Sequence, residues 1–189
     1  MAIVGKNGVG KTTLLRTLMG ELQPDSGTAI WGHEAQIGYM PQDAKLVIPT
    51  NTTCFDYLHD IDPSAGNEML RGLLGRMLFR GDEGMKPTKA LSGGEAVRLL
   101  FCKLMLVQPN ILVLDEPNNH LDLEAISALG EGLAGYPGTV LMVAHDRDLI
   151  ASCATRIFAF HSNGVLEDFA GDYEMFLERH GGFIDERAK

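Results

Sequence analysis

The stretch MAIVGKNGVGKTTLLRTLM, residues 1–19, decides the fold. Its first four residues are apolar and indicate the end of a buried strand, and apolar residues at helical spacing resume after Lys11. Between these segments, Gly5 to Thr12 match the pattern G-x-x-x-x-G-K-[ST] in full, with the preceding strand and following helix that the pattern requires. A glycine-rich turn that only caps a helix is the alternative, and this context disfavours it. We therefore expect a phosphate-binding loop in an α/β protein.

The backbone of such a loop provides most of the phosphate contacts. Glycines allow successive N–H groups to turn inward around the phosphates, and the N-terminus of the next helix adds about half a positive charge. Lys11 is expected to reach the β and γ phosphates, and the hydroxyl of Thr12 to bind Mg²⁺. The predicted phosphate-binding residues are Gly5, Asn7, Gly8, Gly10, Lys11, Thr12 and Thr13.

Length and composition fit one soluble domain, with room for an inserted lobe. The chain has 189 residues, of which 45% are hydrophobic and 22% are charged, as in ordinary globular proteins. It carries 25 acidic and 16 basic residues, so its overall charge disfavours nucleic-acid binding, and no basic run compensates. No apolar run approaches the roughly 20 residues of a membrane span. We expect a cytoplasmic protein that does not itself insert into a membrane and binds no metal beyond Mg²⁺.

The three cysteines lie far apart in the sequence and match no metal-binding or C-x-x-C spacing. Buried, reduced thiols are therefore expected for Cys54, Cys102 and Cys153. The methionines lie mostly within apolar runs and are expected to fill the core.

Two short strands are predicted after the first helix. Residues 28–31 and 36–40 have the composition of strands and flank the turn signal Gly32-His33. Pro41 is expected to end the second strand.

A helical lobe is predicted to follow. From about residue 47 to residue 79 the apolar pattern has helical spacing. Thr53 and Ser64 are the expected N-caps of its two helices. A polar loop, residues 80–90, then leads into a further helix-forming segment.

The last part of the chain returns to strands. The runs at 111–114, 139–144 and 156–160 are almost entirely apolar, and a helix is predicted between the first two, from about residue 122 to 133. Continuous apolar runs separated by helices indicate parallel strands that are buried on both faces. The predicted fold is one α/β domain over residues 1–189, with a mostly parallel sheet flanked by helices: residues 1–46 and 104–189 form its core, and residues 47–103 form an inserted helical lobe.

Two acidic residues follow the apolar run 111–114. Asp115 and Glu116 are therefore placed at the carboxyl end of a buried strand, which is the edge of an open α/β sheet where ligands bind. Asp115 can hold Mg²⁺, and Glu116 can polarise an attacking water. Alone, an acidic pair after a strand is most often a solvated turn. Together with the phosphate-binding loop, it predicts the second half of a nucleotide site.

Two more polar side chains follow strands. His145 ends the apolar run 139–144 and is expected at the same sheet edge as Asp115, where it could donate to the γ-phosphate. Gln42 comes just after the strand 36–40, and its position alone does not decide between a role in the site and an incidental placement.

The segment LSGGE, residues 91–95, has the pattern of a capping box, with Ser92 followed three residues later by Glu95. A capping box does not explain two consecutive glycines, each of which lowers helix stability relative to alanine. Uncovered N–H groups at a helix N-terminus form an anion site. We therefore expect a second phosphate-binding element here, far along the chain from the first.

Taken together, these motifs resemble the ATP-binding cassette (ABC) ATPases. GKNGVGKT, Gln42, LSGGE, ILVLDEP, NNHLD and His145 occur in the order and approximate spacing of that superfamily, across essentially the whole chain. The resemblance implies a P-loop NTPase fold and hydrolysis of ATP to ADP and phosphate, with ATP and Mg²⁺ as ligands. It also implies that two cassettes pack head to tail, in one longer chain or as a homodimer. Ser92, Gly93 and Gly94 would then bind the ATP that is held by the second cassette.

The resemblance also assigns catalytic and metal-binding roles. Lys11 would hold phosphates, Glu116 would orient the attacking water, and His145 would steady the γ-phosphate. The residues that would position Mg²⁺ are Thr12, Gln42 and Asp115.

Several details resemble the ABC-F group, soluble ATPases with two cassettes per chain that bind ribosomes and act on translation. The sequence DEPNNHLD and a signature segment (residues 91–95) that ends in Glu95 are typical of this group. The stretch between Gln42 and Ser92 is short compared with transporter ATPases. Residues 164–181 resemble the segment that ends an ABC-F cassette, and the chain most resembles a C-terminal cassette. The ribosome is the partner that this resemblance implies.

The sequence also departs from the family pattern. It starts at the phosphate-binding loop, so the preceding strands, with the aromatic residue that stacks on adenine, are not in it. Ala144 stands where ABC-F members tend to carry Ser, and Asn118 where Thr is commoner. We expect neither substitution to abolish ATP binding.

Three functions are compatible with these motifs. The first is an ABC-F-type ATPase that closes over ATP and acts on translation. The second is the ATPase subunit of a membrane transporter, for which the short lobe offers a poor surface. The third, suggested by the strands that the sequence lacks, is a truncated module that binds ATP and hydrolyses it little.

Overall fold

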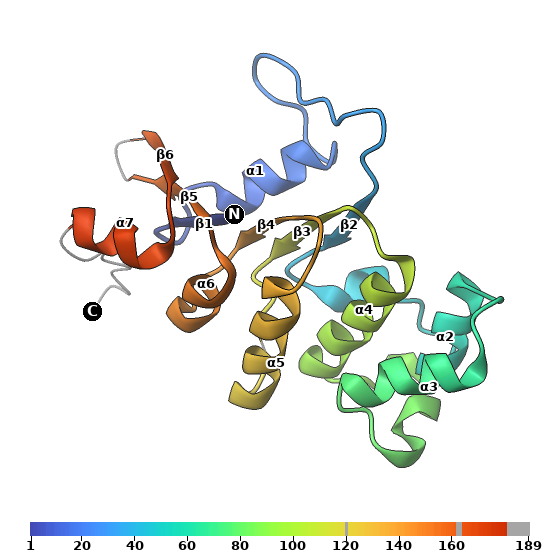
Figure 1. Ribbon diagram of the computed structural model, residues 1–189. Coiled ribbons are helices and arrows are strands. Elements are labelled where there is room, and N and C mark those ends of the chain that lie inside the picture. The colour runs from blue at the N-terminus through green and yellow to red at the C-terminus, as the bar shows by residue number, and fades with distance from the viewer. Residues whose placement is uncertain (120, 162–163, 181–189) are drawn as a thin grey trace.

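The computed structural model describes residues 1–119, 121–161 and 164–180 and is built around a six-stranded sheet (Figure 1). The strands lie in the order β2-β3-β4-β1-β5-β6. Neighbouring strands are parallel except for β6, which runs antiparallel to β5. The strands are β1 (Ala2–Gly5), β2 (Ile37–Met40), β3 (Ile111–Asp115), β4 (Thr139–Val143), β5 (Arg156–Phe160) and β6 (Leu166–Ala170).

Helices cover both faces of the sheet. In Figure 1, α1 lies on one face and α4, α5 and α6 lie on the other, while α2 and α3, the helices predicted for the lobe, lie beyond the β2 edge and pack against α4. The α-helices are α1 (Lys11–Leu18), α2 (Cys54–Ile61), α3 (Asn67–Arg76), α4 (Gly93–Val107), α5 (Leu123–Ala134), α6 (Arg147–Cys153) and α7 (Tyr173–His180), and the 3₁₀ turns are η1 (Ala44–Val47), η2 (Gly81–Met85) and η3 (Thr88–Ala90). The predicted α/β fold with a mostly parallel sheet is confirmed.

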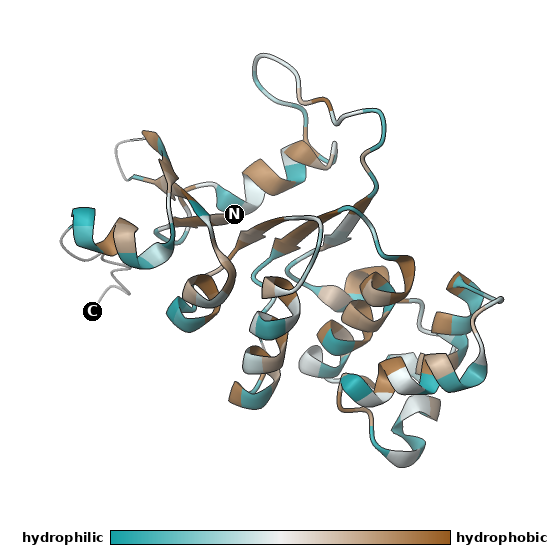
Figure 2. Ribbon diagram, viewed as in Figure 1, coloured by the Kyte–Doolittle hydropathy of each residue, from teal (hydrophilic) through white to brown (hydrophobic). Residues whose placement is uncertain are grey.

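The central strands are mostly apolar because both of their faces are buried. Successive side chains point to opposite faces, so Ile3, Val113 and Val143 join Leu15 of α1 in a small core. Their neighbours Ala2, Leu112, Leu114 and Met142 belong to the larger core, which includes buried residues of α4, α5 and α6. Figure 2 shows the central strands as the hydrophobic layer between the helices.

The strand predicted for residues 28–31 is wrong. These residues form no regular structure, and the side chain of Ile30 is 87% exposed. Trp31 instead packs against the small core and donates its indole N–H to the carbonyl of Leu18 at 2.8 Å. A strand requires a backbone partner, and among the described residues no strand pairs with this segment. The strand-like composition of residues 28–31 was therefore insufficient to predict a strand.

The caps of the lobe were predicted correctly at one helix and wrongly at the other. Thr53 caps α2, because its hydroxyl accepts the N–H of Asp56 at 3.1 Å. Ser64 does not cap α3, which begins at Asn67 after Gly66. The N–H and hydroxyl of Ser64 both donate to Asp62 Oδ1, at 2.9 and 2.6 Å. This local turn competes with helix formation at Ser64.

The cysteines are free thiols, as predicted. Cys54 and Cys102 are buried, and Cys153 is partly buried. Burial raises the pKa of Cys54 to about 11 and that of Cys102 to about 12, so both thiols stay protonated at neutral pH.

Gly38 marks a close approach between β2 and the end of α4, and it yields a stability prediction. A Cβ at this position would lie 2.6 Å from Leu104 Cδ2 and 2.7 Å from Pro109 Cγ. We expect Gly38→Ala to lower the free energy of unfolding, measured by urea denaturation, by about 1–3 kcal/mol through overpacking.

Gly72 in α3 is the matched control, because a Cβ there has nothing within 4 Å. Gly72→Ala should raise the free energy of unfolding by up to about 1 kcal/mol. Equal effects of the two substitutions would contradict the packing described at β2.

Candidate nucleotide-binding site

The loop between β1 and α1 takes backbone conformations that favour glycine. Gly8 has φ 78° and Gly10, the N-cap of α1, has φ 108°, and both values lie in the left-handed region. Gly5 also has a positive φ, 150°, and a Cβ there would in addition lie 2.8 Å from the carbonyl oxygen of Phe160 on β5. Backbone conformation thus favours glycine at all three positions, and packing adds to the requirement at Gly5.

The ammonium of Lys11 lies inside this loop. Lys11 is only 5% exposed, and its Nζ donates to the carbonyl oxygens of Gly5 and Lys6, each at 2.9 Å. The positive charge is therefore fixed beside the N-terminus of α1, where the helix also favours an anion.

Thr12 and Asp115 meet at the bottom of the site. The Thr12 hydroxyl donates to Asp115 Oδ1 at 3.2 Å, which joins the start of α1 to the end of β3. Asp115 is 1% exposed, and its Oδ2 has no hydrogen-bond partner among the described residues. Burial raises the pKa of Asp115, and the hydrogen bond from Thr12 opposes this increase. A buried carboxylate oxygen without a partner, next to a hydroxyl, fits a Mg²⁺ site, since Mg²⁺ prefers oxygen ligands and favours the ionised carboxylate.

Glu116 has an unusual backbone that aims its side chain into the site. Its φ is 51°, in the left-handed region that non-glycine residues rarely adopt. The backbone N–H of Glu116 donates to the carbonyl of Val143 at 2.9 Å and so holds this conformation against β4. Such strained residues persist only where their surroundings fix them, and they cluster at functional sites.

Three side chains surround the Glu116 carboxylate. Oε2 accepts hydrogen bonds from Asn119 Nδ2 at 2.6 Å and from Gln42 Nε2 at 3.1 Å. His145 Nε2 lies 3.5 Å from Oε1, which is an ion-pair distance rather than a hydrogen-bond distance. The ends of β2, β3 and β4 thereby bring Gln42, Glu116 and His145 together.

These elements enclose a cavity of about 560 Å³. Gly5 and Asp115, also predicted for the site, are not among the lining residues and lie behind this wall. Ser92, Gly93 and Gly94 do not line the cavity either. The lining residues are Asn7, Gly8, Gly10, Lys11, Thr12, Thr13, Gln42, Glu116, Asn119 and His145.

Asn119 is the lining residue that the sequence analysis did not assign. It belongs to the motif NNHLD, and its position three residues after Glu116 was the available signal. The spacing did not show that the amide would turn back onto the carboxylate, because the segment between them is neither helix nor strand. Asn119 N–H also donates to the carbonyl of Glu116 at 3.1 Å, which closes this turn.

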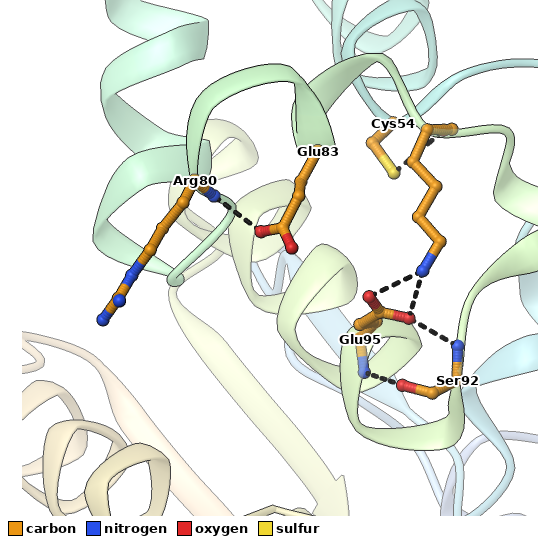
Figure 3. Close-up of polar contacts among 6 residues, drawn as sticks. Cys54, Arg80, Glu83, Ser92 and Glu95 are labelled. Atoms are coloured by element: carbon orange, nitrogen blue, oxygen red, sulfur yellow. Dashed lines mark hydrogen bonds and ion pairs between the residues drawn. The ribbon is translucent and has the colours of Figure 1, made fainter.

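The signature segment forms the predicted capping box at the start of α4 (Figure 3). Ser92 Oγ accepts the N–H of Glu95 at 3.2 Å, and Glu95 Oε2 accepts the N–H of Ser92 at 2.7 Å. Lys86 Nζ contacts both carboxylate oxygens of Glu95, at 2.8 and 2.9 Å. Burial alone would raise the pKa of Glu95, but the hydrogen bonds from Lys86 and Ser92 outweigh it and hold the pKa at about 2.

The fold and the site together define a class of protein. A phosphate-binding loop between β1 and α1, with carboxylates at the end of the parallel strand β3, is the arrangement of a P-loop NTPase.

Comparison with known proteins specifies the family. Residues 1–119 match the ABC transporter family, and the chain belongs to it. It is therefore an ATP-binding cassette, and cassettes of this family are ATPases. No helix within the described ranges is both long and apolar enough to cross a membrane.

The relatives include members of the F group. The chain is 47% identical over 182 residues to YbiT of Escherichia coli O157:H7, a probable ATP-binding protein, covering 96% of this chain and 34% of YbiT. It is 39% identical over 190 residues to ABC transporter F family member 5 of Arabidopsis thaliana, covering 100% of this chain and 27% of that protein. The chain thus spans about a third of the length of the curated relatives it matches.

A solved structure with the same fold is the archaeal ribosome recycling factor aABCE1 in complex with the ribosomal stalk protein aP1. The TM-score is 0.76 at 26% identity, over 95% of this chain and 36% of that one.

The Lys86–Glu95 ion pair predicts how acid affects stability. The pKa of Glu95 falls from 4.5 to about 2 on folding, so the folded state favours the carboxylate. Its contribution is complete above about pH 4.5, at about 3 kcal/mol, and is lost as the pH falls towards 2. We expect Glu95→Gln to lower the free energy of unfolding by roughly this amount at pH 7 and progressively less below pH 4.5, as measured by urea denaturation at several pH values.

Glu131→Gln provides the control, because Glu131 is an exposed glutamate on α5. It should change the free energy of unfolding by less than about 0.5 kcal/mol at every pH. A Glu95→Gln effect that is independent of pH would show that charge is not the source of the stabilisation.

Proposed function

We propose that the cavity binds ATP with Mg²⁺ and that Glu116 directs its hydrolysis. We further propose that the chain works as one half of a head-to-tail pair of cassettes, and that this pair acts on ribosomes in the cytoplasm. The observation that carries the hydrolytic role is the Glu116 carboxylate, held at the cavity wall by Gln42 and Asn119. A carboxylate fixed in this way beside a phosphate-binding loop is suited to orient a water molecule.

The phosphates would be bound mainly by the backbone and one cation. Gly8 and Gly10 turn the loop around the cavity, and the N–H groups at the start of α1 supply partial positive charge. Lys11 would exchange its contacts with the carbonyls of Gly5 and Lys6 for the β and γ phosphates. Its buried position strengthens that interaction, since it is shielded from water.

The metal-binding role falls to Thr12 and Asp115, with Gln42 at the cavity wall. The oxygen ligands of Mg²⁺ would be the hydroxyl of Thr12 and Oδ2 of Asp115, an atom without a hydrogen-bond partner among the described residues. When bound there, Mg²⁺ would neutralise charge on the phosphate oxygens.

The hydrolytic step would use the side chains around Glu116. Glu116 would accept a hydrogen bond from the attacking water and align it with the γ-phosphate. Because Oε2 already receives two hydrogen bonds, Oε1 would be the oxygen that accepts this hydrogen bond from water. His145, which lies 3.5 Å from Oε1, would donate to the γ-phosphate in the same reaction.

The signature segment would complete a second nucleotide site. Ser92, Gly93 and Gly94 lie outside the cavity that their own loop forms, so they would bind the γ-phosphate of ATP held by the partner cassette. Residues 47–103 would act as a helical lobe that carries this segment, with residues 1–46 and 104–189 as the nucleotide-binding core.

The ribosome is proposed as the target on the basis of relatives. The similarity to aABCE1, a ribosome recycling factor bound to a ribosomal stalk protein, supports it, and so does the relative in the F family, through the resemblance to the ABC-F group. The acidic composition, with a net charge of −9, implies that ribosome contact would involve particular surfaces rather than the whole charge of the chain.

Glu116→Gln tests the hydrolytic assignment. We expect hydrolysis to slow by about 10²–10⁴-fold, because the amide is a poor general base, while ATP affinity changes by less than about threefold. Steady-state phosphate release and equilibrium ATP binding measure the two quantities. Normal turnover by this variant would remove Glu116 from the proposed role.

The same variant tests the target, because slow hydrolysis should trap the ATP-bound state. It should sediment with ribosomes in ATP and remain in the supernatant in ADP. Absence of sedimentation, from protein shown to bind ATP, would exclude ribosomes as the target of this chain.

Asn119→Ala tests the support of Glu116. Loss of the 2.6 Å hydrogen bond should release the carboxylate and lower kcat by roughly tenfold, with KM for ATP little changed. Asn118→Ala is the neighbouring control, because Asn118 is not among the residues that line the cavity. Equal loss of kcat in both variants would indicate a general disturbance of the segment.

A further inference from the structure

The proposed binding of a partner's phosphate to the signature segment creates an electrostatic problem. Glu95 stands at the third position of α4, and its carboxylate bonds to the N–H of Ser92 at 2.7 Å. A negative charge is therefore fixed at the helix N-terminus that would receive a phosphate. Like charges brought together in this way weaken association.

The capping box leaves the phosphate-binding donors available. It uses the N–H groups of Ser92 and Glu95. Within the described part of the chain, no hydrogen bond from the N–H groups of Gly93 or Gly94 is found. These two amides and the Ser92 hydroxyl are the donors that an anion could use, provided that the charge of Glu95 is neutralised.

Lys86 meets this requirement. Its ammonium contacts both oxygens of Glu95, at 2.8 Å to Oε1 and 2.9 Å to Oε2, and Oε2 is also the oxygen that accepts the N–H of Ser92, so the carboxylate is neutralised while it caps the helix. The Glu95 side chain is 16% exposed and that of Lys86 is 31% exposed. An ion pair so shielded is screened less by solvent than a surface pair.

The backbone of Lys86 is also held in place. Its carbonyl accepts the N–H of Cys54 at 3.1 Å and the thiol of Cys54 at 3.4 Å, at the start of α2. Its own N–H donates to the carbonyl of Glu83 at 3.0 Å. Two residues on, the N–H of Thr88 donates to the carbonyl of Thr52 at 2.9 Å. The ammonium is thus positioned by the packed lobe and not by a mobile loop.

We propose that Lys86 is a positioning residue for the signature segment: it neutralises and orients Glu95 so that Ser92, Gly93 and Gly94 can bind the γ-phosphate of ATP on a second cassette. The inference rests on the proposed head-to-tail pairing. Lys86 does not touch the nucleotide itself and acts through Glu95.

A substitution at Glu95 can distinguish two roles of Lys86, namely neutralising the Glu95 charge and supporting the fold. Glutamine at this position keeps an oxygen that accepts the N–H of Ser92 but carries no charge. If Lys86 serves to cancel charge, the loss of Lys86 should matter only when residue 95 is Glu. If Lys86 is only a structural support, Lys86→Met should impair the protein whichever residue is at position 95.

The test uses the full chain carrying Glu116→Gln, so that bound ATP is not hydrolysed. Lys86→Met, Glu95→Gln and the double variant are made in this background, with Lys86→Arg as the conservative variant. Lys89→Met is the matched charge control, because Lys89 is exposed and lies on η3 nearby. Sedimentation velocity at increasing protein concentration measures ATP-dependent pairing. ATP binding to each isolated chain measures the affinity of that chain's own phosphate-binding loop, and circular dichroism measures folding.

We expect Lys86→Met to weaken ATP-dependent pairing by at least about tenfold, while ATP binding to its own loop stays unchanged. Glu95→Gln in the same chain should restore pairing to within about threefold of the parent, as coupled neighbouring charges require. Lys86→Arg and Lys89→Met should pair as the parent does.

Different failures have different meanings. If the Glu116→Gln parent does not pair in ATP, the proposed head-to-tail function fails and this inference fails with it. If the parent pairs and Lys86→Met pairs equally well, only the role of Lys86 is overturned. Weak pairing by both Lys86→Met and the double variant, with folding intact, would also overturn the charge-neutralising role.

Discussion

The parallel pairing of β1 with β4 and β5 is the constraint on which the rest of the structure depends. It sets Ala2 beside Met142 and Gly5 beside Phe160, and β3 then pairs with β4 on the other side. Parallel strands end at a common edge, so the phosphate-binding loop, Asp115 and His145 all emerge there. Gly5 allows the close approach, since any side chain would meet the backbone of β5. Without this register, the loop would have no carboxylate beneath it.

Several features that each lower the stability of the fold lie together in this site. Asp115 is buried with an oxygen that has no hydrogen-bond partner within the described ranges, Lys11 is buried with its ammonium bonded to carbonyls, and Glu116 has a left-handed backbone. Each is the kind of feature that the surrounding structure must offset. Here the offset comes from two cores that pack both faces of the sheet and from backbone bonds such as that of Glu116 to Val143. The concentration of such features in one place distinguishes this sheet edge from an ordinary strand-end turn.

In the helical lobe, too, charged side chains are held in place by the structure around them. Hydrogen bonds between residues 52–54 and 86–88 fix the loop that carries Lys86, and Lys86 fixes Glu95 at the start of α4. Gln42 lies a few residues before this lobe and contacts Glu116. The chain between Gln42 and Ser92 therefore connects the wall of the nucleotide cavity to the signature segment through ordered structure.

The sequence by itself determined the features whose chemistry is contained in a few adjacent residues. The phosphate-binding loop, the acidic pair after an apolar strand and the capping box at Ser92 were all predictable, because spacing within one element fixes their geometry. Burial was predicted correctly for Cys54 and Cys102, whereas Cys153 is only partly buried. The tertiary structure alone decided which side chains from outside a single helix or strand meet. It brought Gln42 and Asn119 to one oxygen of Glu116, placed Lys86 on Glu95, and left residues 28–31 without a strand to pair with. The physical reason is that strand pairing and side-chain convergence depend on register and packing between segments far apart in the chain, which local composition does not specify.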